Sequence, residues 1–244
     1  MDYVIKLENV SVSYLQSRKG VHSIKDFVLK ASFINPFQKK GVLHNIDLEI
    51  QKGDSVGILG PNGSGKSTLL RTIAGIIKPD KGTVDVNVRI SPLLALGAGI
   101  ELELSGYENM RIALALSGNY NKATRAEMMD RVTDFAELTK EQLRMPTKMF
   151  STGMLARLAF SCVMTAQPEL LMIDEVLAVG DKGFQKKCMN RIHEIIENGA
   201  TLLFVSHSPG EVQEICKKGV CLKDGKILYK GFADRAVNVY NNLF

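Results

Sequence analysis

A glycine-rich stretch at residues 60–68 carries the clearest chemistry in the sequence. It fits the pattern G-x-x-x-x-G-K-S/T at Gly60, Gly65, Lys66 and Ser67. The apolar run 55–59 before it predicts a buried strand and the run 68–74 after it predicts a helix, so backbone N–H groups would surround phosphate oxygens at a helix N-terminus. Lys66 would reach the β- and γ-phosphates, and the Ser67 hydroxyl would ligate Mg²⁺. The stretch therefore predicts a site for a nucleoside triphosphate.

Two carboxylates end an apolar run further along the chain. Residues 170–173 predict a buried strand, and Asp174 and Glu175 follow it, about 100 residues after the phosphate loop. Asp174 can hold Mg²⁺ through a water molecule, and Glu175 can polarise a water in line with the γ-phosphate. A strand that ends in Asp-Glu is weak evidence for such a site by itself. It becomes stronger evidence here because other elements of the site accompany it.

Two further features fall near this strand. Ser151 and Gly153 belong to a turn of small residues before the helix expected at 155–165, where a helix N-terminus can hold an anion. The same turn is also an ordinary N-cap, with Ser151 as the capping residue. His207 follows the apolar strand 201–206. It could reach a γ-phosphate beside the sheet, although a single histidine at a strand end is usually structural.

Strands that alternate with helices predict an α/β core with a parallel sheet, which would place these residues. The strands are expected at 6–14, 42–50, 55–59, 83–90, 170–173 and 201–206, with a hairpin of 220–222 and 226–229 closed by Asp-Gly. The helices are expected at 68–74, 108–116, 125–138, 155–165, 186–197, 208–217 and 233–243. Residues 15–41 carry basic and aromatic residues, with a short amphipathic helix at 23–33 and a break at Asn35 and Pro36.

The composition predicts a globular protein. The 244 residues are 45% hydrophobic and 23% charged, which allows a substantial core. No apolar run approaches the ~20 residues that span a bilayer, and no signal peptide pattern opens the chain. The four cysteines lack metal-site spacing, which favours buried thiols in a reducing cytosol. The net charge of +5 is mild and suits a solvated surface better than a nucleic-acid or membrane surface.

Together these residues resemble the ATP-binding-cassette ATPases over nearly the whole chain. Residues 60–68 correspond to the family's Walker A loop, 170–175 to its Walker B strand, 150–154 to its signature and 178–181 to its D-loop. His207 falls at the switch histidine, and Tyr14 at the aromatic residue that stacks on adenine. The resemblance implies an α/β fold: a P-loop NTPase (RecA-like) core with a parallel sheet, an antiparallel β subdomain and an inserted α-helical subdomain. One domain would span 1–244, with the core at about 1–95 and 166–244 and the helical subdomain at about 96–165.

The resemblance implies a site for ATP and Mg²⁺. Its catalytic residues would be Glu175, His207 and Lys66, and its metal ligands Ser67 and Asp174. Its nucleotide contacts would be Tyr14, Gly60, Pro61, Asn62, Gly63, Ser64, Gly65, Lys66, Ser67 and Thr68. In this family two cassettes dimerise head to tail. Ser151 and Gly153 would therefore act in trans, on ATP held by a second copy of the chain.

Closer matches narrow the resemblance to a subgroup. The sequences at 150–160, 174–187 and 96–109 are typical of nucleotide-binding subunits that export O-antigen, capsule or teichoic-acid chains. This implies an ATPase, peripheral at the cytoplasmic face of the bacterial inner membrane, that drives a lipid-linked polysaccharide through a separate permease dimer. O-antigen is the favoured cargo, and nucleic acid is not an expected partner. Residues 97–117 would form the docking groove for the permease, and 15–41 would face membrane or glycan lipid, or be a plain surface loop.

Two departures from the family pattern stand out. Residues 91–109 contain no glutamine, and Leu96 takes the place of the family's Mg²⁺-contacting glutamine. Some O-antigen exporters append a C-terminal β-sandwich that recognises the glycan, whereas this sequence ends at Phe244, about a helix past the hairpin. We therefore expect the membrane subunit to choose the substrate.

Two other functions stay open. A soluble cassette ATPase acting on nucleic acid or the ribosome fits the basic charge, but such proteins usually carry two cassettes or long coiled coils. Salt-sensitive binding to DNA or RNA would favour it. A drug or lipid exporter subunit would differ only in its substrate.

Overall fold

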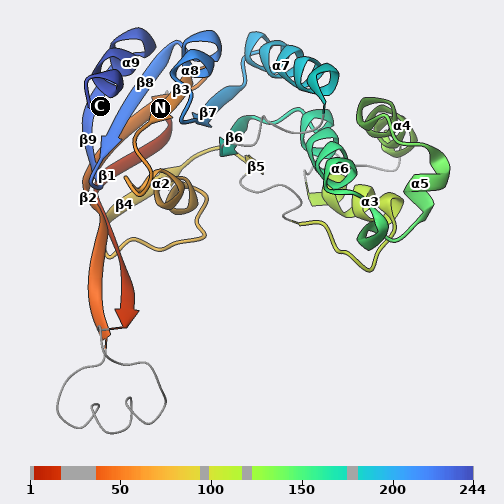
Figure 1. Ribbon diagram of the computed structural model, residues 1–244, viewed down its shortest axis with the longest axis horizontal. Coiled ribbons are helices and arrows are strands. Elements are labelled where there is room, and N and C mark those ends of the chain that lie inside the picture. Colours follow the sequence, from red (N-terminus) through yellow and green to blue (C-terminus); the bar gives the residue numbers. More distant parts are fainter. Residues whose placement is uncertain (1–2, 18–36, 94–98, 117–122, 175–180, 244) are drawn as a thin grey trace, which may run out of the picture.

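The computed structural model describes residues 3–17, 37–93, 99–116, 123–174 and 181–243. Within these residues the chain forms two sheets and a group of helices, with the helices α3 to α6 set to one side of the sheets (Figure 1). The expected helix at 23–33 and the break at Asn35 and Pro36 lie outside the described residues. The expected fold class, an α/β cassette, is confirmed by the mixed sheets and their helices.

The larger sheet has six strands in the order β5-β6-β7-β3-β8-β9, all parallel except the last. The strands are β3 (Ser55–Leu59), β5 (Ile90–Leu93), β6 (Leu170–Asp174), β7 (Thr201–Val205), β8 (Lys218–Lys223) and β9 (Lys226–Phe232). The central strands are continuous apolar runs because layers cover both of their faces.

Successive residues of these strands face opposite layers. Leu171 and Ile173 face the helices α6 (Thr152–Thr165), α7 (Lys182–Glu197), α8 (Pro209–Ile215) and α9 (Ala233–Asn241). Leu170 and Met172 face the layer formed by α2 (Lys66–Ile73) and the second sheet. This period of two divides the core into two hydrophobic layers, one on each face of the sheet.

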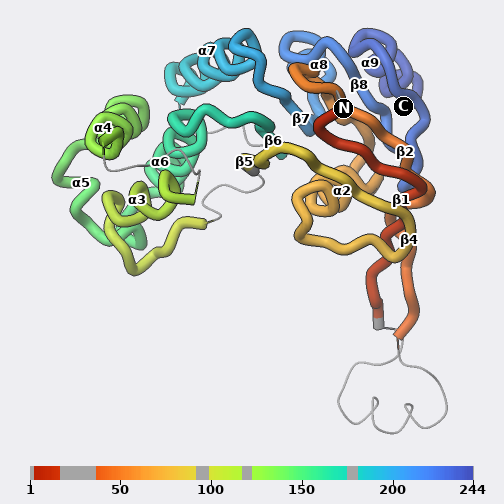
Figure 2. The backbone as a smooth tube through the Cα atoms, turned by 180° about the vertical axis from the view of Figure 1, so that it is seen from behind, coloured from red at the N-terminus to blue at the C-terminus, as the bar shows by residue number. Residues whose placement is uncertain are grey.

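The second sheet is antiparallel, in the order β2-β1-β4. It consists of β1 (Tyr3–Ser17), β2 (Phe37–Gln51) and β4 (Lys81–Val86). Both long strands extend past the expected 6–14 and 42–50. Because β4 pairs with β1 only up to Ser11, the rest of β1 and β2 continues as a two-stranded ribbon away from the body (Figure 2).

The single strand expected at 83–90 is wrong. Residues 81–86 belong to the antiparallel sheet, whereas β5 begins at Ile90 and joins the edge of the parallel sheet. Every second residue from Val84 to Ile90 is a half-buried aliphatic side chain, so the pattern alone did not reveal the change of sheet.

The helical group has its own core. It comprises α3 (Gly106–Leu116), α4 (Arg125–Ala136), α5 (Lys140–Arg144), a 3-10 turn at Thr147–Met149 and α6, packed around residues such as Met110 and Leu158. The sequence did not predict α5, which starts with a capping box between Thr139 and Gln142. None of the helices in the described ranges is both long and apolar enough to cross a membrane.

All four cysteines are free and buried. Burial raises the pKa of Cys162 to about 12, so its thiol stays protonated at neutral pH. These residues therefore act as apolar core residues, as their spacing predicted.

The expected Asp-Gly hairpin is present and holds the phosphate loop in place. Asp224 and Gly225 both have positive φ angles, 48° and 72°, as a two-residue hairpin turn requires. The Gly225 N–H donates to the Ser64 carbonyl at 3.0 Å, and the His44 N–H donates to the Gly225 carbonyl at 2.8 Å. The turn between β8 and β9 thus connects the phosphate loop to β2.

Replacing this glycine should destabilise the protein. In Gly225→Ala the new methyl group meets the Val42 carbonyl oxygen and the backbone stays left-handed, so we expect a loss of about 2–4 kcal/mol in the free energy of unfolding. Gly199→Ala is the control. Its φ is also positive, at 87°, but no heavy atom lies within 4 Å of the new Cβ, so the loss should be about 1 kcal/mol. Urea unfolding of both variants measures the difference, and equal losses would contradict the prediction.

Candidate functional site

The site residues meet at one edge of the parallel sheet. Asp174 pairs with Val205, and Val205 pairs with Ile58, so the three lie in one row across β6, β7 and β3. With a spacing of about 4.8 Å between strands, the row spans about 10 Å. The phosphate loop starts two residues after Ile58, and His207 follows two residues after Val205. The strand register therefore brings the loop, Asp174 and His207 to the same edge.

The phosphate loop is a tight backbone turn. Gly65 has a φ of 106° at the N-cap of α2, where a side chain would also meet Leu43. The Lys66 side chain folds back over the loop and is only 7% exposed. Its Nζ donates to the carbonyl oxygens of Gly60 at 2.6 Å and Pro61 at 3.2 Å. A buried cation and a helix N-terminus thus face the same small space.

The loop fits a phosphate group. Among the described residues, the Ser64 hydroxyl is buried without a hydrogen-bond partner. Buried hydroxyls are normally paired, so an unpaired one beside Lys66 and the first N–H groups of α2 indicates a ligand with acceptor oxygens. These donors and the positive helix end match the charge of a nucleoside triphosphate.

Tyr14, which the resemblance assigns to the nucleotide base, lies beside the loop. Its hydroxyl lies 3.3 Å from the Thr68 Oγ1 at the start of α2, and 40% of the residue is exposed. An aromatic ring exposed next to a phosphate-binding helix is suited to stack on a base.

Asp80 fixes the strand that carries Tyr14, and the sequence did not single it out. Its carboxylate accepts from the Ser13 N–H at 2.6 Å and the Ser13 hydroxyl at 2.7 Å, and it pairs with Lys39 at 3.0 Å. The Ser13 hydroxyl, followed by Lys39, lowers the pKa of Asp80 to about 2. Asp80 belongs to a Lys-Pro-Asp-Lys-Gly turn, whose composition indicated only the turn.

The available metal donors are oxygen atoms. Ser67 is exposed at the first turn of α2, and Asp174 is half-buried at the end of β6. A hydroxyl and a carboxylate suit Mg²⁺, which keeps several waters and commonly binds substrate phosphates. Within the described ranges, no group of three or more His, Cys, Asp or Glu residues could hold a metal by itself. Glu175, the D-loop residues 178–180 and Leu96 lie outside these ranges.

His207 occupies an exposed turn after β7. The buried Ser206 beside it orders this turn, because its hydroxyl donates to Glu211 at 2.7 Å and accepts from the Ser208 N–H at 2.9 Å. His207 is therefore presented at the edge of the sheet from a fixed backbone.

Ser151 and Gly153 lie elsewhere in the molecule. Ser151 caps α6, and its Oγ accepts from the Met154 N–H at 3.2 Å. Both residues line a cavity of about 310 Å³ together with Glu137, Arg157 and Asp181. In both views α6 is separated from α2 by β5 and β6 (Figures 1 and 2). One copy of the chain therefore presents the phosphate loop and the signature turn at two separate places.

Solved structures share this fold along the whole chain. A dimeric, post-hydrolysis state of the ATP-binding cassette MJ0796 with ADP and phosphate matches with a TM-score of 0.74, at 22% identity, covering 94% of this chain and 98% of the other. The structure of an ATP-binding subunit of an ABC transporter matches with a TM-score of 0.75, at 21% identity, covering 98% and 93%. The fold is therefore that of the nucleotide-binding cassettes.

The sequence gives the family. The ABC transporter family model matches residues 43–178, and this chain belongs to that family. The O-antigen export system ATP-binding protein RfbB of Klebsiella pneumoniae is 38% identical over 98% of both chains. The teichoic acids export ATP-binding protein TagH of Bacillus cereus is 36% identical over 98% of this chain, which spans 43% of its length. The resemblance drawn from the motifs is confirmed.

The Asp80 contacts predict a pH dependence. The folded-state pKa is about 2, below the ordinary 3.8, so the stabilisation from Asp80 is present above the ordinary value and is lost as the pH falls through the folded value. Wild type should exceed Asp80→Asn in urea midpoint by a constant amount from pH 7 to pH 5. The difference should shrink between about pH 4 and pH 2. A difference that already disappears at pH 5 would contradict this link.

We expect replacement of Lys66 to weaken nucleotide binding. Lys66→Ala removes the buried cation of the loop, and charged hydrogen bonds of this kind contribute about 1.5–3 kcal/mol each, so the Kd for ATP should rise about 100-fold or pass beyond detection. Titration with a fluorescent ATP analogue measures the change. Lys52→Ala, in the exposed turn before β3, is the matched control and should bind like wild type. Unchanged binding by Lys66→Ala would exclude the loop as the nucleotide site.

Proposed function

We propose that this chain is the ATP-hydrolysing subunit that powers export of a lipid-linked polysaccharide, in the first place O-antigen, through a separate permease in the inner membrane. The observation that carries the proposal is the 38% identity to the Klebsiella O-antigen export subunit over 98% of both chains. A match from end to end covers the helical group as well as the phosphate loop, so it extends beyond the common ATPase core.

The site residues suggest how ATP is held and hydrolysed. The loop N–H groups and Lys66 would bind the phosphates, and Tyr14 would stack on the adenine. Ser67 and Asp174 would hold Mg²⁺, which supplies positive charge to the phosphates when bound. Glu175 would polarise the attacking water, and His207 would contact the γ-phosphate. Donors placed in advance stabilise the charge that develops in the transition state.

Hydrolysis would require two copies of the chain. Ser151 and the phosphate loop lie on different parts of one copy, so a head-to-tail pair would bring the signature turn of each copy to the ATP of the other. MJ0796, which shares the fold, is described as a dimeric cassette. A symmetric pair also forms two equivalent sites.

The permease would dock on the helical group near residues 97–117. Among the described residues of this region, Leu102 is 49% exposed, and Met149 close to it is 65% exposed. The Lys148 N–H donates to the Leu102 carbonyl at 2.9 Å, and Lys148 pairs with Glu103 at 2.7 Å. An exposed apolar pair with charges around it suits a protein partner at the membrane. The chain would then be peripheral on the cytoplasmic face.

Other cargoes remain alternatives. The match to the teichoic acid subunit supports a teichoic acid or capsule cargo, although this chain spans 43% of that protein. A drug or lipid cargo differs only in the substrate. A role on nucleic acid or the ribosome is the weaker alternative, and salt-sensitive binding to RNA or DNA would support it.

Replacement of Glu175 tests the proposed mechanism of ATP hydrolysis. Glu175→Gln should hydrolyse ATP at least 100-fold more slowly and remain as an ATP-bound dimer in size-exclusion chromatography, because the amide cannot polarise water. Glu169→Gln, at an exposed residue just before β6, is the control and should keep the wild-type rate. A wild-type rate in Glu175→Gln would remove Glu175 as the base.

The same variants test export in cells. Deletion of the gene should abolish surface polysaccharide and accumulate lipid-linked glycan in the cytoplasm, where mass spectrometry identifies the polymer. Wild type and Glu169→Gln should restore export, whereas Glu175→Gln should not. Unchanged surface glycan after deletion would refute the polysaccharide proposal and leave an ATPase with another cargo.

A further inference from the structure

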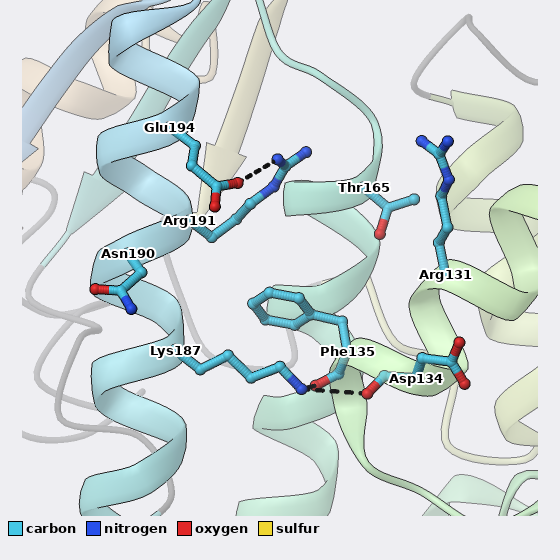
Figure 3. A pocket seen from close by; sticks show the side chains of 8 residues that line it. All are labelled: Arg131, Asp134, Phe135, Thr165, Lys187, Asn190, Arg191 and Glu194. Atoms are coloured by element: carbon cyan, nitrogen blue, oxygen red, sulfur yellow. Dashed lines mark hydrogen bonds and ion pairs between the residues drawn. The ribbon is translucent and has the colours of Figure 1, made fainter.

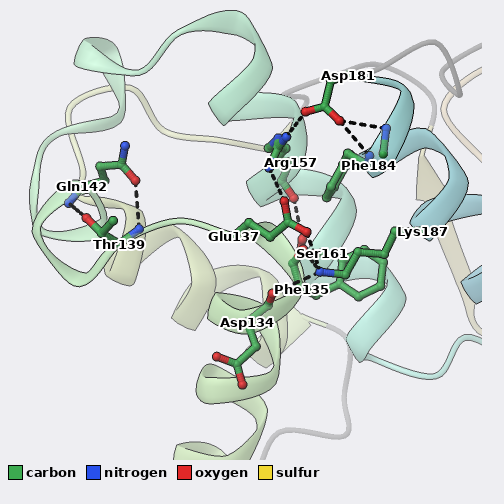
Figure 4. Close-up of polar contacts among 11 residues, drawn as sticks. Asp134, Phe135, Glu137, Thr139, Gln142, Arg157, Ser161, Asp181, Phe184 and Lys187 are labelled. Atoms are coloured by element: carbon green, nitrogen blue, oxygen red, sulfur yellow. Dashed lines mark hydrogen bonds and ion pairs between the residues drawn. The ribbon is translucent and has the colours of Figure 1, made fainter.

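Arg157 lies six residues after Ser151 on α6 and joins three helices (Figure 4). Its Nη1 donates to the Glu137 carboxylate at 2.7 Å, and its Nη2 donates to the Asp181 carboxylate. Its guanidinium carbon lies 4.7 Å from the centre of the Phe184 ring. The Arg157 side chain is only 18% exposed. The planar fork of arginine satisfies both carboxylates and the ring at once, which a lysine cannot do.

Asp181 has two functions at the start of α7. Its Oδ1 accepts from the N–H groups of Gly183 at 2.8 Å and Phe184 at 3.0 Å, while the other carboxylate oxygen receives Arg157. The N–H of Phe184 is the largest cause that lowers the pKa of Asp181, so the carboxylate is charged at neutral pH. In the sequence only six residues join Asp174 to Asp181, and Glu175 is the first of them. Arg157 thus holds the far end of that short connection.

Glu137 anchors Arg157 to the helical group. It ends α4 with a φ of 55°, a left-handed conformation that a non-glycine residue seldom adopts. Its carboxylate pairs with Lys187 at 3.0 Å as well as with Arg157. Strained backbone is commonly retained where a side chain is needed at that place. At this position the Glu137 carboxylate lies between two cations.

The contacts between α4 and α7 are concentrated at the end near this cluster. Lys187 donates to the Asp134 and Phe135 carbonyls, at 3.2 Å and 3.0 Å, and its Nζ lies 4.8 Å from the centre of the Phe135 ring. Beyond Phe135 the two helices separate around a cavity of about 530 Å³ (Figure 3). Arg191 reaches across from α7 to the Met164 carbonyl at the far end of α6. Arg157, near the middle of α6, and Arg191, which reaches its last turn, thus bind α7 to two places on α6.

We propose that Arg157 is a positioning residue for ATP hydrolysis, which holds the Ser151–Gly153 turn and the start of α7 in one fixed arrangement. This inference rests on the proposed function, since the turn acts there on the partner's ATP and Glu175 supplies the base. Ser151, Arg157 and Asp181 all line the same cavity of about 310 Å³. Loss of Arg157 would let the Ser151–Gly153 turn and the start of α7 at Asp181 shift independently of each other.

Variants of Arg157 and Arg191 distinguish a positioning role in hydrolysis from a role in stability alone. Arg157→Ala should lower kcat at least tenfold and change the Kd for ATP in a single subunit less than twofold, because Lys66 and Tyr14 are untouched. Arg157→Lys keeps the charge but not the fork, and should lower kcat by an intermediate factor. Arg191→Ala, which removes the contact between α7 and the last turn of α6, is the matched control. It removes a comparable arginine between the same helices and should keep kcat within twofold of wild type.

Three measurements decide the matter: steady-state ATPase kinetics, nucleotide titration and the urea midpoint. In addition, Arg157→Ala combined with Glu175→Gln should weaken ATP-driven dimerisation, which Arg191→Ala in the same background should not. If Arg157→Ala does not fold, Arg157→Lys carries the test. Equal kcat in the Arg157 and Arg191 variants, or a loss of kcat explained by an equal loss of ATP affinity, would overturn the inference. A wild-type protein without ATPase activity would instead refute the proposed function itself, and the inference with it.

Discussion

The parallel register of β6, β7 and β3 is the constraint on which the core and the site both depend. It places Asp174, Val205 and Ile58 in one row and so brings the phosphate loop, Asp174 and His207 to one edge. The same register sends alternate residues of β6 into two different hydrophobic layers. A shift of one residue would exchange the faces of every side chain in a strand, with a large cost in buried apolar area. Hydrophobic burial therefore fixes the positions of the polar residues that follow the strands.

Charged contacts hold the segments that the parallel strands do not position. Asp80 holds the strand that carries Tyr14, and Arg157 connects the end of α4 to the start of α7. Both contacts are made by side chains that satisfy two or more partners. Exposed ion pairs contribute little to stability by themselves, but backbone N–H donors at fixed positions give these carboxylates a defined geometry. Their effect is therefore on orientation more than on stability.

The sequence predicts the parts of this molecule that depend on local pattern. Continuous apolar runs identified β3, β6 and β7, the Asp-Gly pair identified the last hairpin, and the motif spacing identified the family. The change of sheet between Val86 and Ile90 was missed because one apolar alternation continues from Val84 to Ile90. The Asp80 and Arg157 contacts were missed because they join residues 67 and 24 positions apart, which only the tertiary fold brings together. The reach of the β1–β2 ribbon was missed because polar, exposed strands carry little periodic signal.

The carbonyl contacts of Lys66 have a consequence for turnover. An ammonium group buried without partners would cost several kcal/mol, but here the Gly60 and Pro61 carbonyls already receive it. Any hydrogen bond that the amino group gives to a phosphate is therefore measured against bonds that it already has, and the net gain is only the difference. A leaving product therefore need not abandon a bare charge, because the loop carbonyls accept from the amino group. This small net gain keeps nucleotide binding reversible, as an enzyme that turns over repeatedly requires.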